Sequence, residues 1–171
     1  MPSDAVLYQG AALCLTYPDD AFRARLPLLR EAAPQLREFV DHAALTPPRE
    51  LAAHYVRVFD RDNRHSLYLS RWHEGDTRRP GMSLVRSQEL YRAHELEFTG
   101  AQLPDFLPAV LEFTARTGKL DLLGEYRGAL HRLRARLADC GTPYASVLDA
   151  VCATLPHPER QGRERQEQAG S

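Results

Sequence analysis

The residues that could carry out chemistry gather in the middle of the chain, between Tyr55 and Arg86. This stretch contains the only tryptophan, Trp72, among charged residues and histidines that suggest a metal site. The candidate ligands are His54, Asp60, Asp62, His65, His73, Glu74, Asp76 and His94. Zinc requires three or four ligands at compact spacing, such as two histidines on one helical face. The spacing here matches no such pattern, so we interpret the histidines as solvated or capping residues and expect no bound metal.

Neither an enzyme nor a nucleotide site has a strong signature in this stretch. Ser66 and Ser83 lie near histidines, but no GxSxG element is present, so we expect no enzymatic activity. The run Gly75–Arg79 presents backbone N–H and guanidinium groups that would suit a phosphate. In the competing interpretation it is a turn in which Asp76 caps the following segment and pairs with Arg78. A nucleotide-binding enzyme or switch at Gly75–Arg79 is the alternative hypothesis.

Peptide binding fits the composition of the stretch best. Helical grooves bind amphipathic peptides through apolar anchors, while charged residues at the rim set the orientation. The apolar and aromatic side chains that would line such a groove are Leu67, Tyr68, Trp72 and Leu103. Asp76 and Asp105 would meet basic residues of the bound peptide. For each aromatic residue, burial in the core of the domain is the competing interpretation.

The elements that must position these residues are helices. Apolar residues recur at helical spacing on both sides of the stretch, and no segment alternates at the period of a strand. The expected helices are Ala5–Leu15, Ala21–Leu26, Pro47–Phe59, one that starts at Pro80 or Ser83 and ends at about Leu96, Phe106–Thr117, Leu120–Ala138 and Tyr144–Leu155. The sequence therefore predicts an all-α, single-domain helical bundle with a long irregular central connection.

Several of these helices have recognisable ends. Side chains suited to cap the helices that follow them are those of Asp19 and Asp20, of Thr46 and of Asp105. Gly118 is suited to the left-handed conformation that follows a helix, while Gly141, Thr142 and Pro143 mark the end of one helix and the start of the next.

Proline and glycine also occur inside the helical patterns. We expect a break or kink at Pro27, at Pro34 or at both, because proline lacks the N–H that a helix interior requires. Gly124 and Gly128 each cost a helix roughly 1 kcal/mol relative to alanine, which close contact with a neighbouring helix would offset.

Length and composition indicate a globular protein. The 171 residues, 43% hydrophobic and 26% charged, suffice for one domain with a core, which we place at residues 1–155. Residues 156–171 are almost entirely polar, which predicts a disordered tail. A net charge of -1 provides no field that favours nucleic acid or an anionic membrane. No signal peptide and no apolar window near roughly 20 residues are present, so we expect a cytoplasmic protein without stable membrane insertion.

The three cysteines form no CxxC pair. Cys14 and Cys152 fall on apolar helix faces and are expected to be buried, while reduced thiols fit the cytoplasm.

The segment SLYLSRWHEGDTRRPGMSLVR, followed by LYRAHEL and LPDFLPAVLEF, resembles the NarJ-type nitrate reductase molybdenum-cofactor assembly chaperones of the wider TorD/DmsD family. The likeness runs from Tyr8 to Phe113. It implies a cytoplasmic, all-helical chaperone that is not an enzyme and holds no cofactor, either a monomer or a helix-exchanged dimer. Such chaperones bind the N-terminal peptide of the catalytic subunit of respiratory nitrate reductase. They keep that subunit competent for molybdenum-cofactor insertion and delay its docking to the membrane subunit.

The resemblance also assigns site residues. The GDTR turn of the family falls on Gly75–Arg78, the SLYL segment on Ser66–Leu69, and the proline-aspartate pair on Pro104 and Asp105. The wider family often has histidine after this aspartate, whereas this chain has Phe106, which makes the site more apolar. The expected peptide-binding residues are Leu67, Tyr68, Trp72, Asp76, Arg78, Leu103, Pro104 and Asp105.

Overall fold

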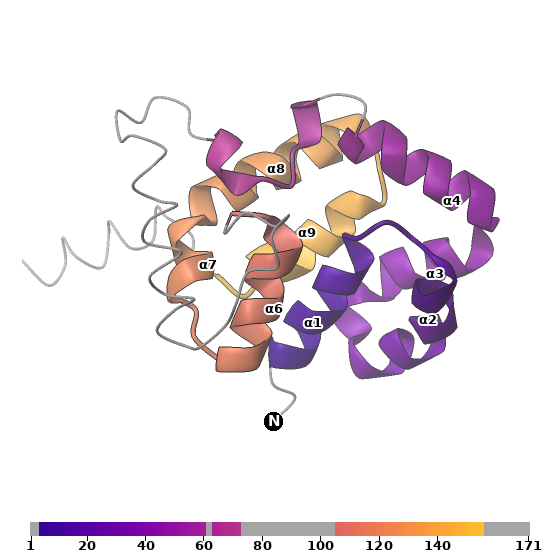
Figure 1. The fold of residues 1–171 in the computed structure, drawn as a ribbon, viewed down its shortest axis with the longest axis horizontal. Coiled ribbons are helices and arrows are strands. Elements are labelled where there is room, and N and C mark those ends of the chain that lie inside the picture. The colour runs from indigo at the N-terminus through magenta and orange to yellow at the C-terminus, as the bar shows by residue number, and fades with distance from the viewer. Residues whose placement is uncertain (1–3, 61–62, 73–104, 156–171) are drawn as a thin grey trace, which may run out of the picture.

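The computed structural model describes residues 4–60, 63–72 and 105–155 (Figure 1). The elements are α1 (Asp4–Cys14), α2 (Asp20–Ala32), η1 (Pro34–Leu36), α3 (Arg37–Leu45), α4 (Pro48–Tyr55), η2 (Val56–Asp60), η3 (Asn63–His65), η4 (Leu69–Trp72), α6 (Leu107–Thr117), α7 (Asp121–Glu125), α8 (Arg127–Cys140) and α9 (Tyr144–Cys152). Within these ranges the only strand-like feature is an isolated antiparallel bridge between Tyr68 and Phe106. The prediction of an all-α fold is confirmed. None of the helices described is both long enough and apolar enough to cross a membrane.

Helix α1 lies at the centre of the core. Its buried residues, among them Leu7, Tyr8 and Ala11, recur at helical spacing. The helix packs against α6 and α9 (Figure 1). The hydroxyl of Tyr8 donates to the hydroxyl of Thr154 at 2.7 Å, which ties α1 to the segment after α9. Gly10 permits close packing against η1, because a Cβ atom there would lie 3.0 Å from the Cδ1 atom of Leu36.

Three predicted helix ends are confirmed. The carboxylate of Asp19 caps α2 by accepting a hydrogen bond from the backbone N–H of Phe22 at 2.8 Å. Gly118 and Gly141 follow α6 and α8 with φ angles of 69° and 75°, in the left-handed region that glycine adopts without strain. The predicted helix that starts at Pro80 or Ser83 and the predicted tail lie outside the described residues.

The prolines of α2 and η1 behave differently from each other. Pro34 begins η1 and breaks the helical run, as expected. The expected break at Pro27 is wrong, because α2 continues through it to Ala32. Pro27 lies on the exposed side of α2 while Leu26 and Leu29 are buried, so apolar packing on the opposite face outweighs the lost hydrogen bond.

The expected cap of α4 by Thr46 is also wrong. The Thr46 hydroxyl instead donates back to the carbonyl of His42 at 2.6 Å, in the last turn of α3. Helix α4 begins at Pro48 with no side-chain cap, and proline is suited to that first position because it has no N–H to satisfy. Past Tyr55 the predicted helix continues as the π-helical turn η2.

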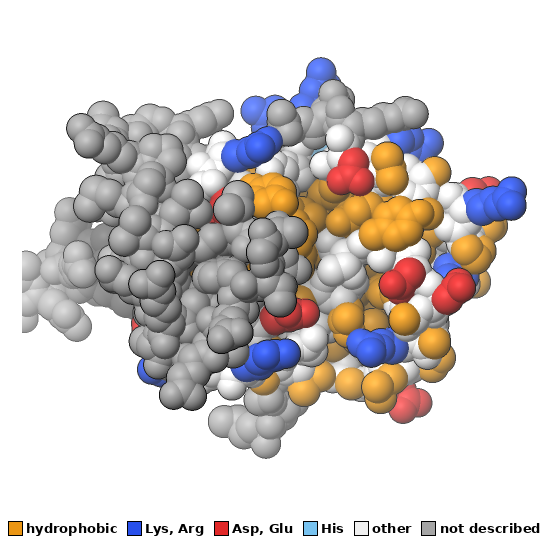
Figure 2. Space-filling view, in the orientation of Figure 1, with side chains coloured by type: hydrophobic (Ala, Val, Ile, Leu, Met, Phe, Trp, Pro, Cys, Tyr) orange, Lys and Arg blue, Asp and Glu red, His pale blue; other side chains and the backbone are white. Residues whose placement is uncertain are grey.

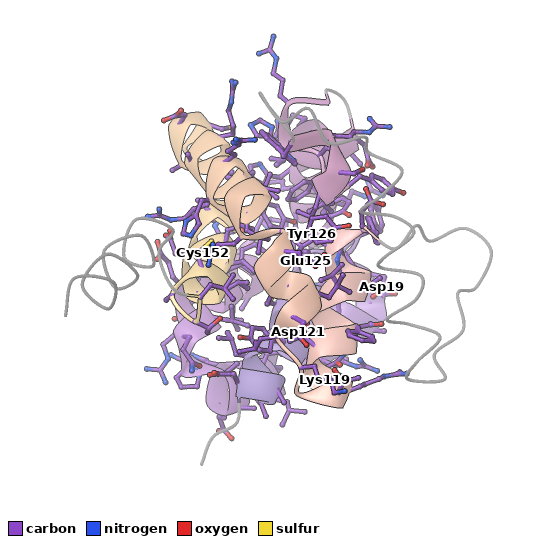
Figure 3. The ribbon with its side chains drawn as sticks, turned by 90° about the vertical axis from the view of Figure 1, so that its left-hand side faces the viewer. Asp19, Lys119, Asp121, Glu125, Tyr126 and Cys152 are labelled. Carbon is purple, nitrogen blue, oxygen red and sulfur yellow. The ribbon has the colours of Figure 1, made fainter. Side chains whose placement is uncertain are left out.

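The single helix expected from Leu120 to Ala138 is two helices. Tyr126, which is 2% exposed, separates α7 from α8, and its backbone N–H bonds to the carbonyl of Leu123 three residues earlier (Figure 3). Burial of its aromatic ring therefore competes with helix continuity. The part of the chain that the structure describes provides no close contact at Gly124 or Gly128, because a Cβ atom at either position would meet none of its atoms within 4 Å.

Candidate peptide-binding site

The segment Ser66–Trp72 is held against the start of α6 by backbone hydrogen bonds. The N–H of Leu69 donates to the carbonyl of Asp105 at 2.9 Å, and the N–H of Leu107 donates to the carbonyl of Leu67 at 2.8 Å. These bonds flank the antiparallel bridge between Tyr68 and Phe106. Ser66–Trp72 and Asp105–Leu107, two stretches far apart in the sequence, therefore form one local unit.

The alternation of extended backbone separates the side chains of this unit into two sets. Leu67, Leu69 and Leu107 are buried, with exposures of 5%, 0% and 0%. Tyr68 and Phe106 are half-buried and pair with each other, with ring centroids 5.1 Å apart and planes tilted by 41°. The unit thus directs leucines into the core and an aromatic pair toward the surface.

A guanidinium group adjoins the aromatic pair. The Cζ atom of Arg71 lies 5.8 Å from the centroid of the Tyr68 ring, within the range of a cation–π contact. Arg71 itself is exposed. The pattern that could have identified Arg71 is its position three residues after Tyr68, which places the two side chains together in a helical turn.

Asp105 does not have the role expected of it as a helix cap. No side-chain hydrogen bond caps α6, and the Oδ2 atom of Asp105 instead accepts from the backbone N–H of Ser70 at 3.2 Å and from the Ser70 hydroxyl. Asp105 is 1% exposed, and its Oδ1 atom has no hydrogen-bond partner among the described residues. In this conformation the carboxylate anchors the Ser66–Trp72 segment and is not presented to solvent.

Trp72 closes the same segment on itself. Its indole N–H donates to the carbonyl of Ser66 at 2.8 Å, while its own carbonyl accepts a hydrogen bond from the guanidinium of Arg132 on α8. The indole packs against the core and is partly exposed. The polar atom of the ring is thus used internally, and only its apolar surface is available to a bound peptide.

The structure brings together four of the eight expected site residues. Leu67, Tyr68, Trp72 and Asp105 belong to this unit, with Leu67 and Asp105 buried within it. The other four, Asp76, Arg78, Leu103 and Pro104, lie outside the described residues. The alternative nucleotide site at Gly75–Arg79 also lies outside them and stays a prediction.

The histidines in the described part of the chain have structural partners. The Nε2 atom of His54 lies 2.7 Å from the Thr142 hydroxyl, and its ring stacks on Tyr144 at 5.6 Å. Burial, then the positive charge of Arg57, lowers the pKa of His54 below its usual value. The Nδ1 atom of His65 lies 3.1 Å from a backbone carbonyl. Among residues 4–60, 63–72 and 105–155, no three metal-ligating side chains converge.

Comparisons with known proteins agree with this architecture. The profile of the nitrate reductase delta subunit family matches residues 24–149. A nitrate reductase-like protein NarX of Mycobacterium tuberculosis is 34% identical over 158 residues, which are 87% of this chain but 24% of that protein. The chain thus spans about a quarter of that relative.

Relatives closer in length are named as chaperones. The probable nitrate reductase molybdenum cofactor assembly chaperone NarJ of Bacillus subtilis is 29% identical, over 88% of each protein. The NarJ chaperone of Escherichia coli is 30% identical over 80% of this chain and 64% of its own length. A solved structure of a putative redox enzyme maturation protein from Archaeoglobus fulgidus has the same fold. Its TM-score is 0.70 with 20% identity, covering 88% of this chain and 92% of that one.

Proposed function

The chain belongs to the nitrate reductase delta subunit family, and we propose that it is a NarJ-type chaperone that assists assembly of a respiratory nitrate reductase. In this role it is not an enzyme. It binds the N-terminal peptide of the catalytic subunit in the cytoplasm and keeps that subunit competent for insertion of the molybdenum cofactor before membrane docking. The similarity to NarJ relatives over most of the chain supports the chaperone role.

The observation that supports peptide binding is the aromatic pair of Tyr68 and Phe106 beside Arg71. Half-buried aromatic rings on a fixed backbone provide apolar contact area at low entropic cost, because few rotatable bonds are immobilised on binding. The backbone bridge and the buried Asp105 carboxylate hold both rings in place before a peptide arrives. Apolar side chains of the peptide would pack on this pair and on the exposed edge of Trp72.

The remaining expected residues complete the proposal. Asp76 would attract basic residues of the peptide, chiefly improving orientation and association rate, while Arg78, Leu103 and Pro104 would border the groove. Asp105 acts as a positioning residue, since its carboxylate is engaged by Ser70.

A co-purification experiment tests the proposed function. Tagged chaperone is produced together with the reductase catalytic subunit, either complete or without its leading segment. The proposal predicts that the complete subunit is retained, that the shortened subunit is lost, and that the finished membrane-bound reductase contains no chaperone. Retention of the shortened subunit would exclude the leading segment as the binding determinant.

A further inference from the structure

A second surface, on the outward side of α4 and η2, has features that an ordinary solvated helix face lacks. It is a groove of about 530 Å³, and its lining residues are Tyr17, Arg49, Ala52, Ala53, Val56 and Arg57. It is formed by elements other than the unit of Tyr68 and Phe106. The groove therefore requires its own explanation.

The sequence of α4 and η2 produces two opposite faces. Leu51, Tyr55 and Val58 face the core and are buried. The groove residues that belong to α4 and η2 occupy positions i, i+3, i+4, i+7 and i+8, counted from Arg49. This spacing places them along one stripe of the helix. The centre of this stripe is two alanines and a valine, where a solvated helix usually carries charged or long polar side chains.

An exposed aromatic residue forms one wall of the groove. Tyr17 is 54% exposed, and its ring meets the buried ring of Tyr55 edge-on, with centroids 5.8 Å apart and planes at 87°. The hydroxyl of Tyr55 donates to the carbonyl of Leu15 at 3.2 Å, so the supporting ring is itself fixed. Figure 2 shows hydrophobic side chains gathered over the α1–α2 connection and α4, with both basic and acidic side chains around them.

The two ends of the stripe are positively charged. Arg49 and Arg57 are exposed, and neither forms an ion pair with another described residue. Eight residues of helix separate them, which corresponds to roughly 12 Å along the axis. The described carboxylates nearest in sequence, Glu50 and Asp60, do not line the groove. Arg57 lies in the π-helical turn η2, and π turns within helices occur frequently at functional sites.

From this arrangement we propose that the α4–η2 groove binds an acidic amphipathic helix of a partner protein. The alanines permit close approach of the partner helix, Tyr17 packs on its apolar face, and the two guanidinium groups bind carboxylates at either end of that face. The occupant is acidic because the charged groups of the groove are both cationic. This surface and its partner are independent of the proposed peptide site at Tyr68 and Phe106.

Fluorescence anisotropy with a labelled synthetic helical peptide tests this proposal. The probe carries leucines on one face and glutamates flanking them at about 12 Å spacing. A second peptide replaces each glutamate with lysine. The full-length protein is expected to bind the glutamate peptide, to discriminate against the lysine peptide, and to lose affinity as salt concentration rises.

Variants assign the binding to the groove. Simultaneous replacement of both arginines, Arg49→Glu and Arg57→Glu, is expected to weaken binding of the glutamate peptide roughly tenfold. The matched control replaces the exposed Arg25 and Arg37, also by glutamate, and is expected to leave the affinity unchanged. Ala53→Trp, at an exposed position, fills the groove and is expected to weaken binding without charge reversal. Thermal unfolding confirms that each variant is folded.

Three results would overturn the proposal. The first is failure of the glutamate peptide to bind, and the second is equal binding of the glutamate and lysine peptides. The third is an equal effect of the groove and control charge reversals, which would indicate attraction by net charge alone.

Discussion

The carboxylate of Asp105 accepts hydrogen bonds from both the backbone N–H and the hydroxyl of Ser70, although 35 positions separate the two residues. This contact joins the segment that carries Tyr68 to the segment that carries Phe106. Because Asp105 is 1% exposed, its carboxylate would be costly to bury without these partners. The pairing of the two aromatic residues at the surface thus depends on a polar contact beneath them.

Removal of the Ser70 hydroxyl is expected to loosen this segment. Ser70→Ala takes away one of the two hydrogen bonds to the buried carboxylate, at a cost of about 1–3 kcal/mol. Urea unfolding followed by circular dichroism reports global stability, and fluorescence of Trp72, the only tryptophan, reports the segment itself. In Ser70→Ala, the urea midpoint measured by tryptophan fluorescence should decrease more than the midpoint measured by circular dichroism. The control, Asp139→Asn at an exposed position, should leave both urea midpoints unchanged. Equal midpoints in Ser70→Ala and Asp139→Asn would contradict this role for Ser70.

The outcome at Asp105 illustrates what could be predicted from sequence. Caps and terminators that depend on the adjacent residues, such as Asp19, Gly118 and Gly141, were correctly predicted because their chemistry is local. Asp105 has the same local signature as Asp19, but Ser70 competes for its carboxylate from a distant part of the chain. No local pattern contains that information.

Core packing limited the predictions in a second way. The uninterrupted apolar periodicity from Leu120 to Ala138 predicts one helix, yet burial of Tyr126 divides it. Pro27 predicts a break, yet packing of α2 continues the helix through it. For the site, the role of the apolar segment around Tyr68 in peptide binding stays a prediction, whereas its pairing with Phe106 depends on tertiary contacts that no local pattern contains.

Stability is expected to fall in mildly acidic solution through His54. Burial holds the pKa of folded His54 below the ordinary histidine value of 6.5, so the unfolded state binds the proton first as the pH falls. The contribution of neutral His54 is therefore complete above pH 6.5 and is lost as the pH decreases through the lower folded pKa. Urea midpoints measured between about pH 8 and about pH 5 should decrease more in the wild type than in His54→Gln. An equal decrease of the urea midpoint in the wild type and in His54→Gln would show that His54 does not contribute to this pH dependence of stability.

Thiol reactivity should distinguish the three cysteines. Burial raises the pKa of Cys14 to about 12 and that of Cys152 to about 11, so neither forms appreciable thiolate near neutral pH. Cys140 is exposed. A colorimetric thiol reagent should therefore modify one cysteine in the native protein and three after denaturation. Cys140→Ser should abolish the native reaction, and rapid modification that persists in this variant would contradict the burial of the other two.

Two glycine substitutions should have opposite effects on the free energy of unfolding. Gly141→Ala forces a side chain into the left-handed region at φ 75° and should destabilise the protein by about 1–2 kcal/mol. Gly128→Ala, within α8 and with open space around the new methyl group, should stabilise it by up to about 1 kcal/mol. Chemical unfolding of both variants provides the comparison. Destabilisation by Gly128→Ala would indicate a close helix contact after all.

The most direct measurement is calorimetric titration of this protein with the N-terminal peptide of the catalytic subunit of the nitrate reductase, the partner proposed above. Tyr68→Ala is compared with Tyr17→Ala, which removes another surface tyrosine that contacts an aromatic neighbour. The proposed site predicts that the wild type binds, that Tyr68→Ala weakens binding by roughly tenfold or more, and that Tyr17→Ala binds like the wild type. Unchanged affinity in Tyr68→Ala, or a loss confined to Tyr17→Ala, would contradict peptide binding at the Tyr68–Phe106 pair.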